Sequence, residues 1–290
     1  MWIEVALCVL ACGQDLDRRP SPAQKKETIA FLHSLSLEDG GFRSAPGESS
    51  SNLRATSSCI RALKYFGGKA RDPEKSKSFI LSCWNPEEGG FSDVPRGKLS
   101  PVSTAVGLMG VREFQQVPQT MATKAVRFLE ENARGFEDIR MAAASLESLG
   151  ISSKANGRWL QEVKKQARAD GVFGTPEDEI RATGGAAACW LRLGGKLPDA
   201  GMVIRLLKNG QNEDGAYSKS KNVDSDLETS YRVVRSLHML KEQPARKDAL
   251  IHFISRCRNR DGGYGVAPGM SSTASGTYFA GILLHWLETP

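Results

Sequence analysis

A short turn motif recurs along this chain, and its spacing constrains the fold more than any other feature. The sequence NRDGGYG at residues 259–265 has close copies that end at other aromatic residues. The turn aromatics are Phe42, Phe91, Phe136, Phe173, Tyr217 and Tyr264, of which Phe136 ends a degenerate copy, ARGF. Successive aromatics are 49, 45, 37, 44 and 47 residues apart, a period that indicates a repeat protein whose unit is one supersecondary element.

Each repeat is predicted to contain two helices of different character. The segment before each turn is amphipathic, and in the first repeat Ser21, Pro22 and Gln24 have the pattern of a capping box, so a helix should begin there. The segment after each turn is richer in small and apolar residues, as in the alanine runs 142–144 and 186–188. Small residues allow helices to pack closely on several sides. The pattern therefore predicts an outer helix with one solvated face, followed by a buried inner helix.

Six such repeats predict an all-α protein of twelve helices. The turn glycines are expected to adopt positive φ where each outer helix ends, with the next aromatic packing beneath. These glycines are Gly40, Gly89, Gly171, Gly215 and Gly262. An open solenoid would leave apolar faces uncovered at both ends and would need atypical capping repeats. We therefore expect the repeats to close into a toroid, with an inner ring of helices wrapped by an outer ring.

Composition argues against several other classes of protein. The formal charge is +6, but the basic residues are scattered among acidic and amide neighbours, so no nucleic-acid partner is predicted. The six cysteines show neither the spacing of a zinc ribbon nor that of a disulfide framework. No stretch of the body approaches the ~20 apolar residues of a transmembrane span.

Residues 1–20 are interpreted separately from the toroid domain predicted for residues 21–290. The segment MWIEVALCVLACGQ resembles an export signal, with Cys12 in the place of the lipidated residue of a lipoprotein. However, no basic residue precedes its apolar run and Glu4 interrupts it, which also fits a plain N-terminal helix. An exported or lipid-anchored location and a cytoplasmic one are both compatible with this segment.

As a set, the repeats resemble those of the prenyltransferase and squalene-cyclase superfamily over residues 22–288. The GGF and GGY turns, the polar loop after each turn and the segment EDIRMAAASLESL at 137–149 carry the resemblance, and this segment is similar to the β subunits of protein prenyltransferases. The resemblance implies an α6–α6 toroid with a funnel-shaped central cavity for an isoprenoid, with Arg140 in the isoprenoid pocket. It also implies prenyl-transfer activity and a separate helical-repeat partner subunit.

Zinc is the cofactor that the resemblance implies, and the residues at the corresponding positions predict that this chain does not bind it. Protein prenyltransferases hold zinc through an Asp-x-Cys pair and a His, and the metal ionises the acceptor thiol. Alignment on the inner-helix sequences places Gly184, Ala186 and Ala274 at these three positions. None of these side chains can ligate a metal.

The superfamily's cyclases suggest a second chemistry. They protonate an alkene with an acid from an Asp-x-Asp-Asp motif, and the segment VDSDLETSY at 223–231 resembles that motif loosely. Asp226 and Glu228 are therefore candidate catalytic acids. Acidic residues at a helix start also cap free N–H groups and stabilise the helix dipole, and this reading is favoured here.

The remaining candidate residues would bind a ligand. Arg54, Arg140 and Arg181 fall about one turn into their inner helices, where they would either grip a diphosphate or carboxylate head group or form salt bridges between repeats. Tyr231 and Tyr278 are candidates to line an apolar tunnel, although helical aromatics are more often ordinary core.

Three functions remain open at this stage. The first is a prenyltransferase-like toroid that binds an isoprenoid, and the second is a non-catalytic toroid that binds a protein or lipid partner. The third is a small terpene-cyclase-like enzyme. Isoprenoid binding is the preferred hypothesis, because a fold analogy alone does not establish a reaction.

Overall fold

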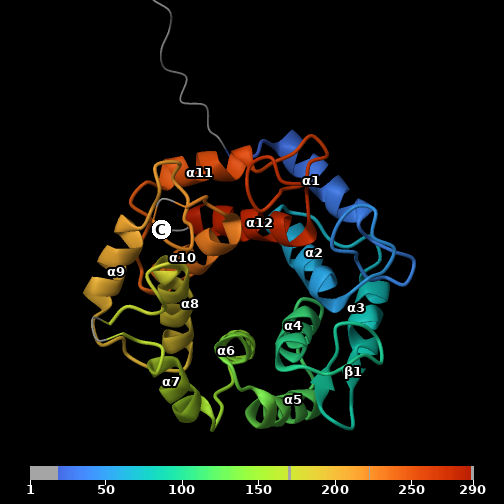
Figure 1. The fold of residues 1–290 in the computed structure, drawn as a ribbon. Helices are drawn as coiled ribbons and strands as arrows, with labels where there is room; N and C mark the ends of the chain where they lie inside the picture. Colours follow the sequence, from blue (N-terminus) through green and yellow to red (C-terminus); the bar gives the residue numbers. More distant parts are fainter. Residues whose placement is uncertain (1–18, 169–170, 222, 289–290) are drawn as a thin grey trace, which may run out of the picture.

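Twelve helices form two concentric rings in the computed structural model, which describes residues 19–168, 171–221 and 223–288 (Figure 1). The inner ring consists of α2 (Leu53–Tyr65), α4 (Pro101–Arg112), α6 (Phe136–Leu149), α8 (Glu179–Arg192), α10 (Leu227–Met239) and α12 (Ala274–Glu288). The outer ring consists of α1 (Pro22–Ser34), α3 (Pro73–Ser82), α5 (Gln119–Asn132), α7 (Asn156–Lys164), α9 (Ala200–Asn209) and α11 (Lys247–Arg256). The predicted all-α toroid of six helical hairpins is confirmed.

The turn motif forms a short antiparallel reversal. In the second repeat it gives the one β-hairpin of the described residues, β1 (Trp84–Asn85) paired with β2 (Gly90–Phe91). In other repeats the same reversal gives isolated bridges, such as Arg258 with Tyr264. Phe136 differs from the other turn aromatics because it is the first residue of α6, so the degenerate copy leads directly into the inner helix.

The five turn glycines have the predicted positive φ, with values between 75° and 88°. Glycine is also required because each turn packs against the next outer helix. A Cβ on Gly40 would lie 2.4 Å from the carbonyl oxygen of Lys75 in α3, and a Cβ on Gly262 would lie 2.6 Å from that of Glu27 in α1. The turn is therefore the joint between consecutive repeats, and the last joint connects the sixth repeat to the first.

A buried hydroxyl group anchors five of the turns to the inner helix that follows. The N–H of Phe42 donates to Thr56 Oγ1 at 2.9 Å, and the N–H of Tyr264 donates to Thr277 Oγ1 at 3.1 Å. The corresponding pairs in the other repeats are Phe91 with Thr104, Phe173 with Thr183 and Tyr217 with Ser230. These bonds satisfy the N–H groups of buried aromatics that would otherwise lack a partner.

The inner helices all begin on the same side of the ring. The N–H of Leu227 at the start of α10 donates to Val266, in the loop that precedes α12, and the N–H of Ala274 at the start of α12 donates to Ser44, in the loop that precedes α2. Four inner helices, α2, α8, α10 and α12, thus start beside the loop that leads to the next inner helix. Side chains at equal depth along these helices therefore lie in a common layer.

Two other expectations concern the N-terminal part of the chain. The capping box at the start of α1 is present, because Ser21 and Gln24 exchange the two expected hydrogen bonds. The export-signal segment with Cys12 lies outside the described residues. Within the described ranges, no helix is both long and apolar enough to cross a membrane.

Candidate functional site

Charged side chains gather at the N-terminal ends of three inner helices. Glu137 and Arg140 of α6, Arg181 of α8, and Glu228 and Arg232 of α10 form what we call the N-terminal ion-pair cluster. Glu137 accepts from Arg140 Nη2 at 2.7 Å and from Arg232 Nη1 at 2.7 Å. Glu228 accepts from Arg181 Nη2 at 2.6 Å and from Arg232 Nη2 at 2.9 Å. Three guanidiniums thus share two carboxylates.

The electrostatics of this cluster favour the ionised state of Glu137. Burial alone would raise the pKa of Glu137, but the guanidiniums of Arg140 and Arg232 outweigh it and hold this pKa at about 2. The pair with Arg232 also connects α6 to α10, although α8 stands between these helices in the ring (Figure 1). The side chains therefore meet on the inner side of α8.

A second ion-pair group lies nearer the C-terminal ends of the same helices. Glu147 of α6 accepts from Arg192 Nε of α8 at 2.9 Å and from Arg235 Nη2 of α10 at 2.6 Å. Burial would raise the pKa of Glu147, but the two guanidiniums lower it overall. The ring interior is therefore charged at two depths.

Aromatic side chains line the part of the inner ring formed by α10, α12 and α2, which shares α10 with the ion-pair groups. We call this group the aromatic wall; it consists of Tyr65 of α2, Tyr231 of α10, and Tyr278, Phe279 and Trp286 of α12. The Tyr231 ring lies 5.4 Å from Trp286 and 5.2 Å from Phe279, and the Tyr65 ring lies 6.3 Å from Tyr278, all between centroids. Tyr231 and Phe279 are only partly buried, so the wall has an accessible face.

Two arginines border the aromatic wall. The guanidinium of Arg61 in α2 lies 4.6 Å from the Tyr278 ring centroid, and that of Arg235 lies 5.3 Å from the Trp286 ring centroid. Both distances are within the range of a cation–π interaction. The wall thus combines apolar ring surface with two positive charges, each held over a ring.

The wall tyrosines differ in how readily they ionise. Burial raises the pKa of Tyr278 well above its usual range, and Arg61 offsets this only in part. Burial would also raise the pKa of Tyr231, but the guanidiniums of Arg192, Arg61, Arg140 and Arg235 lower it overall. Tyr231 therefore lies in the positive potential of arginines from four inner helices, α2, α6, α8 and α10.

The predicted site residues have different environments. Arg140 and Arg181 join the N-terminal ion-pair cluster, whereas the side chain of Arg54 is exposed on α2. Asp226 is the N-cap of α10, where it accepts from the N–H and the hydroxyl of Thr229 at 2.7 and 2.8 Å. Glu228, the other candidate acid, is engaged by two arginines.

Tyr231 and Tyr278, the two predicted tunnel residues, do come together, with centroids 6.1 Å apart. Sequence reasoning missed Arg61, Arg192, Arg232 and Arg235. The signal for two of them was an arginine one turn from an aromatic residue on an inner helix: Arg61 precedes Tyr65 by four residues, and Arg235 follows Tyr231 by four.

The positions that correspond to zinc ligands are parts of helix packing. A Cβ on Gly184 would lie 3.0 Å from the backbone nitrogen of Val233, so α8 and α10 touch there through their main chains. Ala186 and Ala274 are buried. The described residues contain no group of three or more His, Cys, Asp or Glu side chains able to hold a metal ion. These residues do not fit a zinc centre.

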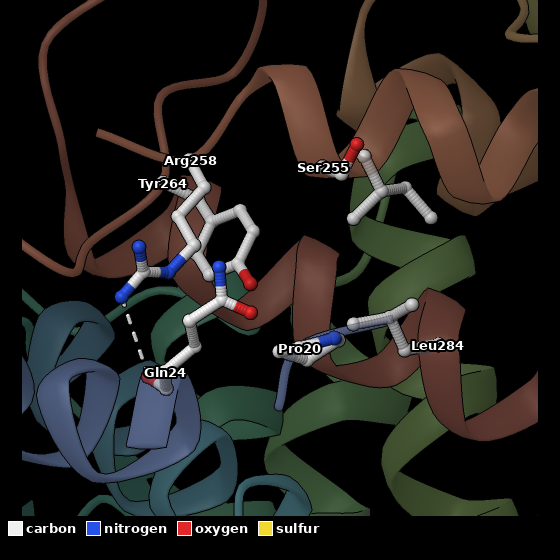
Figure 2. A pocket seen from close by; sticks show the side chains of 7 residues that line it. Pro20, Gln24, Ser255, Arg258, Tyr264 and Leu284 are labelled. Atoms are coloured by element: carbon white, nitrogen blue, oxygen red, sulfur yellow. Dashed lines mark hydrogen bonds between the residues drawn. The ribbon is translucent and has the colours of Figure 1, made fainter. Parts of the chain in front are cut away.

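A small pocket lies where the sixth repeat meets the first. Pro20 and Gln24 line it from one side, and Ser255, Arg258, Tyr264 and Leu284 are among the residues on the other (Figure 2). Its volume of about 40 Å³ suits one or two water molecules rather than an organic ligand. Arg258 there donates to the Gln24 carbonyl at 3.4 Å and to Glu27 at 2.5 Å, so the pocket belongs to the ring closure.

A closed ring of six helical hairpins with arginines and aromatics on its inner helices defines the chain as an α6–α6 toroid protein. The family model of the prenyltransferase alpha-alpha toroid domain matches residues 1–72, 62–131 and 139–288. The chain belongs to this family. No curated protein sequence matches it significantly.

Solved structures share the fold at low sequence identity. Protein geranylgeranyltransferase-I of Candida albicans, complexed with GGPP, is 13% identical with a TM-score of 0.68, over 90% of both chains. The type II terpene cyclase MstE from Scytonema is 12% identical with a TM-score of 0.61, over 92% of this chain and 98% of that one. A glycosidase in complex with glucose is 13% identical with a TM-score of 0.59, over 95% of this chain and 99% of that one. Because these three proteins have different activities, their similarity to this chain establishes its fold but not its function.

Proposed function

We propose that the inner ring binds an apolar, isoprenoid-like molecule that carries an anionic end. The observation that carries this proposal is the aromatic wall bordered by an excess of arginines. Six interior arginines, Arg61, Arg140, Arg181, Arg192, Arg232 and Arg235, pair with four glutamates, Glu113, Glu137, Glu147 and Glu228. The six arginines exceed the four glutamates by two charges, and one of these glutamates, Glu113, also pairs with the exposed Lys64.

Both parts of this arrangement suit such a ligand. Aromatic rings present a large apolar surface to an alkyl or prenyl chain. Guanidiniums recognise carboxylates and phosphates through charge-assisted hydrogen bonds. Membership of the prenyltransferase toroid family supports an isoprenoid as the apolar part, as does the GGPP complex of the geranylgeranyltransferase with the same fold.

The proposal covers binding and not zinc-dependent prenyl transfer. Gly184, Ala186 and Ala274 offer no ligand atoms at the positions where the resemblance places them. A helical-repeat partner subunit stays a prediction from the resemblance.

Thermal melting of the purified chain with prenyl ligands tests the proposal. The ligands are farnesyl and geranylgeranyl diphosphate, each with and without zinc. Inorganic diphosphate, which has no prenyl chain, is the control. A ligand at a hundred times its Kd that binds only the folded state should add about 2.7 kcal/mol to stability. We expect a shift with the prenyl compounds, none with inorganic diphosphate, and no further shift with zinc.

Two variants locate the binding site. Phe279→Ala removes a partly buried ring of the aromatic wall and should reduce the shift. Arg127→Ala on α5 removes an exposed charge of the outer ring and should leave the shift unchanged. If no prenyl compound stabilises the protein, the proposal is wrong and a protein partner becomes the better hypothesis.

A further inference from the structure

Tyr278 carries an unsatisfied hydrogen-bonding group in the inner ring. Its side chain is nearly enclosed, with 6% of the residue exposed, and its hydroxyl has no hydrogen-bond partner among the described residues. A buried hydroxyl without a partner costs free energy, so such a group usually has a role. The ring of Tyr278 is surrounded by Arg61, Tyr65 and Tyr231 from the two adjacent inner helices.

Arg61 is the interior arginine with the poorest ion pairing. Each of the other five interior arginines has a carboxylate oxygen within 2.9 Å. The nearest carboxylate oxygen to Arg61 belongs to Glu113 and lies 4.0 Å away, and its other polar contacts are Met109 Sδ, also at 4.0 Å, and the side chain of Tyr65. Glu113 in turn forms a 2.9 Å pair with Lys64, so its charge is already balanced.

The unpartnered hydroxyl of Tyr278 and the weakly paired guanidinium of Arg61 belong to neighbouring side chains. The guanidinium of Arg61, with 21% of its side chain exposed, lies over the ring whose hydroxyl lacks a partner. Arg235, at the other end of the aromatic wall, also has a buried Nε without an acceptor. The wall is therefore supplied with donors and short of acceptors, which is the composition of an anion site.

Building on the proposed function, we propose that Arg61 and Tyr278 bind the anionic end of the ligand, and that this end is a carboxylate. A guanidinium can hold both oxygens of a carboxylate, and a phenol hydroxyl adds one more bond to the same group. A diphosphate carries more charge and needs several cations around it. When a carboxylate binds at Arg61, the arginines of the N-terminal ion-pair cluster can remain paired with Glu137 and Glu228.

The position of this subsite separates it from that cluster. Arg54, although not in the cluster, occupies on α2 the position that Arg140 and Arg181 occupy on α6 and α8, and Arg61 follows it by seven residues, about 10 Å further along the helix axis. The ligand class is therefore an apolar acid, such as a prenyl carboxylic acid, with its carboxylate at the depth of Arg61 and its chain along the aromatic wall.

Binding measurements with matched ligands test this assignment. Geranylgeranoic acid, geranylgeraniol and geranylgeranyl diphosphate share one chain and differ in the end group, and their Kd values are measured by calorimetry on the full chain. We expect the acid to bind at least tenfold more tightly than the alcohol. Arg61→Gln should weaken binding of the acid tenfold to a hundredfold and remove its advantage over the alcohol.

Three further variants keep the test decisive. Tyr278→Phe removes only the hydroxyl and should weaken binding of the acid about tenfold, so it replaces Arg61→Gln if that variant does not fold. Arg127→Gln on the outer ring is the control and should leave the Kd of the acid unchanged within about twofold, whereas Arg140→Gln tests the N-terminal ion-pair cluster as the alternative site of the end group. Circular dichroism and melting confirm that each variant is folded.

The outcomes separate this inference from the proposed function. If the prenyl compounds bind but the acid has no advantage over the alcohol, or if Arg140→Gln rather than Arg61→Gln removes that advantage, the subsite is wrong and the proposed function stands. If none of the three compounds binds the wild-type chain, both are wrong.

Discussion

Arg232 of α10 and Glu137 of α6 form a 2.7 Å ion pair, although α8 lies between their helices in the ring. Arg235 and Glu147 repeat this relationship deeper in the ring, with a 2.6 Å pair. The non-neighbouring helices α6 and α10 are thus joined at two depths through their side chains. The interior polar groups therefore contribute to the shape of the ring as well as to its charge.

Glu137→Gln should destabilise the protein by about 1 kcal/mol at pH 7, because Arg140 and Arg232 lose a shared partner. The expected loss of stability is small because the carboxylate of Glu137 is half exposed, so that solvent screens its ion pairs. The folded-state pKa of about 2 lies below the unfolded value, so this stability is present above about pH 4.5 and is lost as the pH falls towards 2. Urea unfolding at pH 7 and pH 3 should show a smaller difference between wild type and variant at pH 3. A difference independent of pH would contradict this account. Glu131→Gln, which removes an exposed outer-ring pair, is the matched control.

Tyr278→Phe should stabilise the unliganded protein, by about 1 kcal/mol, because it removes a buried hydroxyl that has no hydrogen-bond partner. Urea unfolding measures the change. A loss of stability of that size would mean that the hydroxyl is already satisfied in the free protein, and would also weaken the case for a carboxylate there.

Gly262→Ala should cost more than Gly47→Ala, although the two glycines have similar φ of 87° and 90°. Both substitutions force an L residue into a left-handed conformation, at a cost of about 1–2 kcal/mol. Only at Gly262 does the new Cβ also approach the Glu27 carbonyl to 2.6 Å, whereas nothing lies within 4 Å at Gly47. The difference between the two free energies of unfolding therefore measures the joint between the sixth and first repeats, and equal losses would argue against such a joint.

Thr277→Val should destabilise the protein by about 1–3 kcal/mol, because the N–H of Tyr264 would lose its acceptor in a buried site. Thr277→Ser keeps the hydroxyl and should retain most of the stability, as Ser230 does at the corresponding position. Thermal unfolding of both variants distinguishes loss of the hydrogen bond from loss of the methyl group. The hydrogen bond is unimportant if the two variants are equally destabilised.

Tyr231 should be the first tyrosine of the folded protein to ionise. Burial would raise its pKa, but the guanidiniums of Arg192, Arg61, Arg140 and Arg235 bring it below the usual value. Burial raises the pKa of the other tyrosines, to about 12 at Tyr264 for example. Ultraviolet titration should therefore show a single phenol ionising below pH 10, and Tyr231→Phe should remove this step. Persistence of the step in the variant would assign it to another residue.

Much of the fold could be predicted from local sequence. A turn glycine such as Gly40 and a cap such as Ser21 act within a few residues, so their conformations follow from the neighbouring sequence alone. Closure into a ring followed from counting repeats with buried helices. The buried hydroxyls that anchor the turns, such as that of Thr56, can be recognised in the sequence only once the aromatic residue that each one anchors is known.

The candidate site was less predictable because its contacts join distant segments. Arg232 and Glu137 are 95 residues apart, and nothing local in either helix indicates the other as a partner. Aligning the repeats placed Arg140 and Arg181 at equivalent positions and left salt bridges between repeats open as their role, with Glu228 as one possible partner, but it gave no indication of Glu137. The weak ion pairing of Arg61 depends on what lies around it in three dimensions.

The packing of Gly262 against α1 makes the order of the repeats cyclic rather than linear. A linear array can fray from its terminal units, whereas detaching any hairpin from a closed ring breaks two interfaces at once. Unfolding should therefore be more cooperative than in an open repeat protein of the same length. For the same reason, new chain ends introduced in an inter-repeat loop, with the first and last repeats linked, should leave all six interfaces intact.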